Sequence, residues 1–155
     1  MISKIKNIAL SLREWELILL VIVLNFLNNY IFSVVSTFFN ISLNKGFNNN
    51  YTFNEKIVLF LIVAPLIETL LFQCIVIEMA KSLKIKTIYC CILSAFLFAL
   101  SHIYNIFYFT YAFMGGLMFA FLYTRGKNQK YAILLPLITH IIYNSIVFII
   151  KTYFS

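Results

Sequence analysis

Charged residues are scarce in this sequence, and aspartate is missing altogether. Only 11% of the 155 residues are charged and 63% are hydrophobic, whereas about a quarter of the residues in soluble domains are charged. So few polar side chains cannot cover the surface of a water-soluble domain. The composition therefore predicts a single membrane domain over residues 1–155, built as an all-α, polytopic transmembrane helical bundle.

Cysteine is also rare, and its spacing fits neither a disulfide framework nor a metal site. Cys74, Cys90 and Cys91 all lie in apolar segments, and no CxxC pair occurs. We expect buried, reduced thiols. The net charge of +7 comes from basic residues in short flanks and turns, where Lys and Arg contact anionic lipid. These charges indicate a lipid bilayer as the partner, and no nucleic acid.

Long apolar runs divide the chain into five predicted spans, at about residues 15–39, 57–80, 87–102, 106–123 and 131–150. The polar loop at 40–55 is expected to be the most mobile part. The 38 residues from 87 to 124 include no charge-capable side chain except that of His102. One span needs only about 20 residues. The chain must therefore fold back, and we place that turn at residues 103–105.

Lys and Arg gather on one side of the predicted bundle. Nine of them precede the first span or lie in the turns at 81–86 and 125–130, and three lie in the 40–56 loop or after the fifth span. The positive-inside rule then places the N-terminus in the cytoplasm. A bias towards Ile, Phe, Asn and Lys is typical of AT-rich bacterial genomes. We therefore expect a multi-pass protein of a bacterial cell membrane.

One acidic residue, Glu68, lies in the middle of the second apolar run. A charged group at bilayer depth is costly, and such a residue is by default a candidate functional site. Pro65, three residues earlier, has no backbone N–H and predicts a kink or local opening of the helix beside the acid. The alternative is a glutamate that only holds helices together through a hydrogen bond to a neighbour.

Two histidines and an asparagine extend this candidate site. His102 ends the third predicted span, and His140 and Asn144 lie four residues apart on one face of the fifth. Together with Glu68 they suffice for hydrolysis. The carboxylate can take a proton from water with the help of one histidine. The other histidine and Asn144 can donate hydrogen bonds to an oxyanion.

Two further readings of these polar residues stay open. His, His and Glu are also zinc ligands, although the sequence has no HExxH motif. Zinc is therefore the alternative to a site without a cofactor. In the first span, Asn25, Asn28 and Asn29 form one polar stripe that must face the bundle. These amides either hold helices together or line a substrate groove.

The three polar segments resemble the motifs of the CAAX protease and bacteriocin-processing (CPBP, or Abi) family of intramembrane glutamate-dependent endopeptidases. That family carries EExxxR, FxxxH and HxxxN motifs in this order. The matching positions are Glu68 to Gln73, Phe98 to His102, and His140 to Asn144. The resemblance covers roughly residues 57–150. It implies that Glu68 and His102 activate water while His140 and Asn144 stabilise the oxyanion. The substrate would be a membrane-associated protein or a small secreted peptide.

The sequence departs from the family pattern at two positions. Thr69 and Gln73 replace the second Glu and the Arg of the first motif. We expect them to form a neutral hydrogen-bonding pair near Glu68, because losing both charges together leaves no unpaired buried charge. Family members commonly have further N-terminal helices, so this chain resembles a minimal core. The alternative function is a non-catalytic bacteriocin self-immunity or regulatory protein of the same fold.

Overall fold

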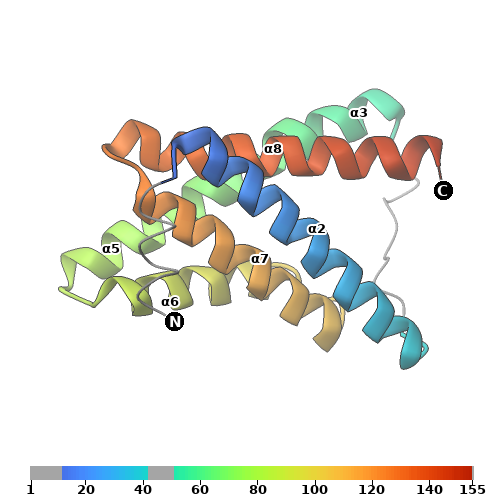
Figure 1. The fold of residues 1–155 in the computed structure, drawn as a ribbon, viewed down its shortest axis with the longest axis horizontal. Coiled ribbons are helices and arrows are strands. Elements are labelled where there is room, and N and C mark those ends of the chain that lie inside the picture. Colours follow the sequence, from blue (N-terminus) through green and yellow to red (C-terminus); the bar gives the residue numbers. More distant parts are fainter. Residues whose placement is uncertain (1–11, 42–50, 155) are drawn as a thin grey trace.

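The computed structural model describes residues 12–41 and 51–154, and within these residues it contains helices and no strand. Within the described residues, five helical rods follow one another (Figure 1): α2 (Glu14–Phe38), a continuous helix from Phe53 to Ser82, α6 (Thr87–Leu100), α7 (Ile106–Arg125) and α8 (Gln129–Tyr153). The predicted all-α class is confirmed. The predicted mobility of the 40–55 loop concerns mainly residues 42–50, which lie outside the described residues.

Four of the five rods are long and apolar enough to cross a membrane, and α6 is the exception. Its 14 residues extend over only about 21 Å, against a hydrocarbon core of about 30 Å. The predicted turn at 103–105 is confirmed, because α6 ends at Leu100 and α7 begins at Ile106. Asn105 caps α7 by accepting a 2.8 Å hydrogen bond from the Tyr108 N–H.

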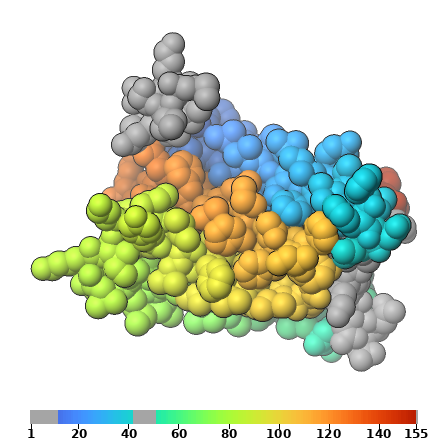
Figure 2. Space-filling model, turned by 90° about the horizontal axis from the view of Figure 1, so that it is seen from below, coloured from blue at the N-terminus to red at the C-terminus, as the bar shows by residue number. Residues whose placement is uncertain are grey.

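Helix α7 lies at the centre of the bundle and packs against α6, α2 and α8. Figure 2 shows the face on which α6, α7 and the C-terminal half of α2 lie side by side. The Gly115-Gly116 pair of α7 lies where these helices pack closely. A Cβ atom on Gly116 would lie 3.0 Å from Ala95 Cα, and one on Gly115 would lie 3.2 Å from Asn25 Oδ1. The two glycines therefore allow α6 and α2 to approach α7 closely.

The helix from Phe53 to Ser82 is interrupted twice. Short α-helical pieces α3 (Phe53–Ile57), α4 (Ala64–Glu68) and α5 (Val76–Ser82) alternate with the π-helical segments η1 (Val58–Val63) and η2 (Thr69–Ile75). Pro65 accounts for the first widening, because it has no N–H to donate and its ring crowds the preceding turn. The Ala64 N–H bonds to Leu59 O instead, five residues back. The predicted local opening beside the acid is thus confirmed.

The three cysteines are free thiols. Cys90 and Cys91 are buried, and Cys74 is partly exposed. Cys90 and Cys91 belong to a small apolar cluster between α5, α6, α7 and α8. The predicted burial is confirmed for Cys90 and Cys91, which pack the core at the end of the bundle away from Glu68, and is wrong for Cys74.

Candidate functional site

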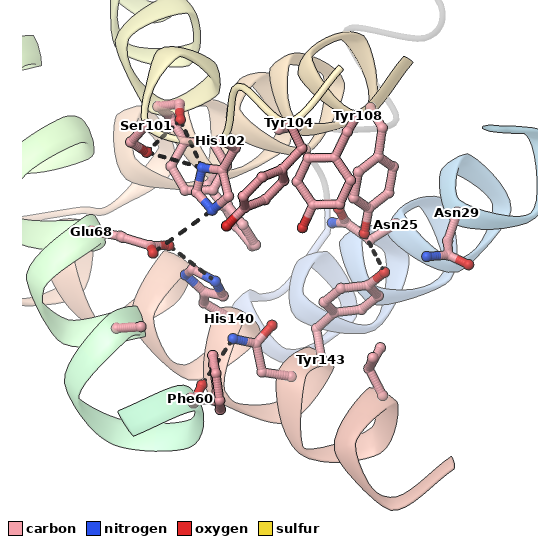
Figure 3. A pocket seen from close by; sticks show the side chains of 18 of the residues that line it. Asn25, Asn29, Phe60, Glu68, Ser101, His102, Tyr104, Tyr108, His140 and Tyr143 are labelled. Atoms are coloured by element: carbon pink, nitrogen blue, oxygen red, sulfur yellow. Dashed lines mark hydrogen bonds and ion pairs between the residues drawn. The ribbon is translucent and has the colours of Figure 1, made fainter. Parts of the chain in front are cut away.

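A pocket of about 600 Å³ lies between α2, η1, α4, α7, α8 and the C-terminal end of α6. All four side chains of the predicted site line it: Glu68, His102, His140 and Asn144. They come from two helical rods, the interrupted helix and α8, and from the turn after α6, as Figure 3 shows for the labelled residues. The structure therefore brings together the acid, both histidines and the amide.

Glu68 lies between the two imidazole rings (Figure 3). Its Oε1 is 3.8 Å from His102 Nε2, and its Oε2 is 3.6 Å from His140 Nε2. The Glu68 side chain is 20% exposed, so it can be reached from the pocket. Both distances are longer than an ordinary hydrogen bond. Each leaves room for a water molecule that is hydrogen-bonded to Glu68 and to the histidine.

The position of His102 follows from the way α6 ends. The Ser101 hydroxyl donates to Phe98 O at 2.7 Å, and His102 Nδ1 also contacts this carbonyl at 2.9 Å. The side chains of Ser101 and His102 thus donate to a backbone carbonyl near the C-terminal end of α6. Because a carbonyl can only accept, Nδ1 carries the proton in this contact. In the neutral ring, Nε2 then holds a lone pair directed at Glu68.

His140 is held by aromatic rings rather than by hydrogen bonds. Its ring stacks on Phe119 at a centroid distance of 4.6 Å and meets the edge of Phe98 at 6.2 Å. The residue is only 5% exposed. Its Nδ1 has no hydrogen-bond partner among the described residues. No hydrogen bond therefore fixes the tautomer, and Nε2 is free to carry the proton towards the pocket.

Asn144 binds the interrupted helix directly. Its Nδ2 donates a 3.0 Å hydrogen bond to Phe60 O in η1. This carbonyl lies where Pro65 and the π-helical turn disturb the regular ladder of the helix. One of the two N–H groups of the amide is therefore used, and the other can still serve a ligand.

The predicted hydrogen-bonding pair of Thr69 and Gln73 is wrong. Both side chains are buried, at 1% and 0% exposure, so they do face the bundle rather than lipid. However, Thr69 Oγ1 and both polar atoms of Gln73 have no hydrogen-bond partner in the described part of the chain. Both residues lie in η2, where the wider π-helical turn does not stack side chains at i and i+4 as an α-helix does.

A group of tyrosines in the pocket was missed by the sequence reasoning. Tyr104, Tyr108, Tyr111 and Tyr143 all line it. The hydroxyl groups of Tyr111 and Tyr143 lie 2.7 Å apart, and the backbone carbonyl of Tyr111 accepts a 3.0 Å hydrogen bond from Asn28 Nδ2. A signal was present, since Tyr143 precedes Asn144 directly and the other three follow His102 within nine residues.

The asparagine stripe on α2 faces both a neighbouring helix and the pocket. Asn28 is buried and links α2 to α7, as the predicted packing role requires. Asn25 and Asn29 line the pocket. Asn25 is only 2% exposed and donates to Val21 O at 3.0 Å. This side of α2 therefore contributes polar groups to the pocket wall.

No group of three or more His, Cys, Asp or Glu residues suited to a metal ion occurs within residues 12–41 and 51–154. The pair of histidines around Glu68 still supplies ligand types that zinc accepts. Zinc dependence therefore stays a prediction that a chelator can test.

A family model described as type II CAAX prenyl endopeptidase Rce1-like matches residues 52–146. This region contains the interrupted helix, α6, α7 and the part of α8 that carries His140 and Asn144. No curated protein and no solved structure shows a significant match.

Proposed function

Since the chain belongs to the Rce1-like family of type II CAAX prenyl endopeptidases, we propose that it is an intramembrane endopeptidase. Its substrate is a membrane-associated protein or a small secreted peptide, and no prenyl group is required. Glu68 and His102 activate the attacking water, and His140 with Asn144 stabilises the oxyanion. The proposed setting is the bacterial cell membrane, with residues 1–155 acting as one membrane domain.

The observation that carries this proposal is the placement of Glu68 between two imidazole nitrogens, at 3.8 and 3.6 Å, in a pocket of about 600 Å³. One water oxygen can lie at about 2.8 Å from both Glu68 Oε1 and His102 Nε2. His102 orients this water through its lone pair, and the Glu68 carboxylate takes the proton as the water oxygen adds to the peptide carbonyl. Glu68 then returns the proton to the leaving amine.

The oxyanion forms on the carbonyl oxygen when water adds. His140 Nε2 faces the same pocket from the other side of Glu68 and can donate a hydrogen bond to that oxygen. The second N–H of Asn144 is a further donor. The hydrogen bond from Asn144 to Phe60 O keeps the amide in place before substrate binds.

A second function is favoured by one specific observation. Thr69 and Gln73 stand where the resembled family has a charged pair, and their buried polar atoms make no hydrogen bond in the described residues. If Thr69 and Gln73 no longer hold Glu68 in its catalytic position, the protein would keep the fold without hydrolysing peptide bonds. The alternative is therefore a non-catalytic self-immunity or regulatory membrane protein.

Glu68→Gln separates the two functions. The change keeps the shape of the side chain but removes its ability to accept a proton. If the protein is a peptidase, cleavage of co-expressed small secreted peptides and membrane proteins falls by about 10²–10⁴. The matched control is Glu78→Gln. Glu78 lies on the same rod but pairs with Lys81 at 2.9 Å and accepts from Tyr123, outside the pocket. Full cellular function of Glu68→Gln would establish the non-catalytic alternative.

A further inference from the structure

We propose that the pocket opens on the non-cytoplasmic side of the membrane and takes polypeptide segments that have been exported across it. This inference rests on the proposed peptidase function for its substrate class. Its basis is the depth of the pocket residues within their helices, the shortness of α6 and the charge of the turns.

The pocket runs from the middle of the bundle towards one end only. Glu68 and His140 form its deep part. Glu68 lies about 22 Å along its helix from Phe53, which is at the open end. His140 lies about 16 Å along α8 from Gln129, which is at the closed end. The remaining lining residues lie almost entirely towards the end that carries the α6–α7 turn and the C-terminus. At that end, Ser101, His102, Tyr104 and Lys151 line the pocket.

The shortness of α6 explains why the pocket is open at this end. α6 starts at Thr87, directly after the basic turn, and ends at Leu100, about 21 Å further on. It therefore stops roughly 9 Å short of crossing a hydrocarbon core of about 30 Å. His102 comes two residues after the helix, so it is recessed below the membrane surface. The exposed side chains of Ile103 and Ile106 flank this recess.

The charge of the turns identifies the side of the membrane. The two turns at the closed end carry or adjoin six basic residues, namely Lys81, Lys84, Lys86, Arg125, Lys127 and Lys130. At the open end, the turn at residues 103–105 carries none, and the 40–56 loop carries two, Lys45 and Lys56. Basic residues in short turns remain in the cytoplasm.

The pocket wall also fits an exported segment of low charge. Four tyrosines and the amide of Asn29 line the pocket with polar groups, and Lys151 is the one Lys or Arg side chain among the lining residues. Such a wall can bind the backbone of an extended peptide without matching particular charges. The substrate class is therefore a small secreted peptide or the non-cytoplasmic part of a membrane protein, rather than a cytoplasmic chain.

The orientation is tested by labelling single cysteines from outside. With Cys74, Cys90 and Cys91 replaced by Ala, Ile103→Cys places a thiol at the open end and Leu83→Cys places one at the closed end. Both side chains are exposed, at 62% and 74%. A membrane-impermeant sulfonated maleimide added to intact spheroplasts is expected to label Ile103→Cys as fully as in lysed cells. Leu83→Cys should be labelled only after lysis. Phe154→Cys, also at the open end, replaces Ile103→Cys if that variant does not accumulate.

Labelling of Leu83→Cys in intact spheroplasts, or protection of both Ile103→Cys and Phe154→Cys, would overturn the proposed side. The substrate class is tested separately with one cleaved peptide, expressed either behind a secretion signal or without it. Cleavage should be lost when the signal is removed, and cleavage of the cytoplasmic form would contradict the inference. Glu68→Gln in the same strains distinguishes the outcomes. If neither form is cleaved by the wild-type protein, the peptidase function itself fails, while the labelling result still decides the orientation.

Discussion

The adjacent glycines of α7 give a matched pair of substitutions with different expected effects. An added Cβ on Gly116 would meet Ala95 Cα at 3.0 Å, Phe98 Cδ1 at 3.1 Å and Ala95 Cβ at 3.3 Å. The backbone of α6 cannot yield without moving the helix. An added Cβ on Gly115 would meet only the end of the Asn25 side chain, at 3.2 Å, and that amide can shift by a few tenths of an ångström.

The expected magnitude follows from this difference. Replacing Gly by Ala within a helix gains about 1 kcal/mol from helix propensity. This gain is the same for Gly115→Ala and Gly116→Ala and cancels when the two are compared. Forcing an extra methyl group against a packed backbone costs about 1–3 kcal/mol. Gly116→Ala should therefore have a free energy of unfolding lower than that of Gly115→Ala by about 1–3 kcal/mol.

Activity should follow the same order, because Phe98 contacts both imidazoles. Its ring centroid lies 4.6 Å from that of His102 and 6.2 Å from that of His140. The assay is reversible unfolding of both variants in mixed micelles of increasing SDS content, paired with peptide cleavage in cells. Equal stability of the two variants, or a more stable Gly116→Ala, would refute the close packing of α6 on α7.

Three further outcomes are expected. Gln73→Met should raise the free energy of unfolding by about 1–3 kcal/mol in the same assay, because it removes buried polar atoms that make no hydrogen bond in the described residues; destabilisation would show that Gln73 has a partner. The double variant Glu68→Gln, His102→Ala should cleave scarcely more slowly than either single variant, since both act on one water; multiplied losses would separate their roles. EDTA should leave cleavage unchanged, and restoration of an EDTA-sensitive activity by zinc would establish the metal alternative.

The convergence of the four polar side chains was predictable from the sequence for a physical reason. A bilayer leaves polar groups no partner except the bundle interior, so Glu68, His102, His140 and Asn144 had to face inward. The i and i+4 spacing of the last two fixed their common face. The turn at 103–105 followed from length alone, since one span cannot hold 38 residues.

The remaining features depend on contacts between distant segments. In the sequence, Pro65 indicated a local opening at η1, but η2 contains no proline that could have indicated it. The hydrogen bond from Asn144 to Phe60 O joins residues 84 positions apart and involves a backbone atom, which carries no sequence signal. The predicted pairing of Thr69 with Gln73 assumed an α-helical spacing, but the segment that contains both residues is π-helical. The tyrosines of α7 look like ordinary membrane aromatics until packing directs them into the pocket.

The central claim is that Glu68 activates a water molecule that cleaves a peptide bond. The measurement that tests it most directly is cleavage of an identified peptide by the purified, reconstituted protein in 18O-labelled water, followed by mass spectrometry of both product and protein. The account predicts 18O in the new C-terminal carboxylate of the product, none in the Glu68 side chain, and product formation by Glu68→Gln that is lower by about 10²–10⁴. Incorporation of 18O into Glu68 would make it a nucleophile rather than a base, and undiminished product from Glu68→Gln would contradict the account altogether.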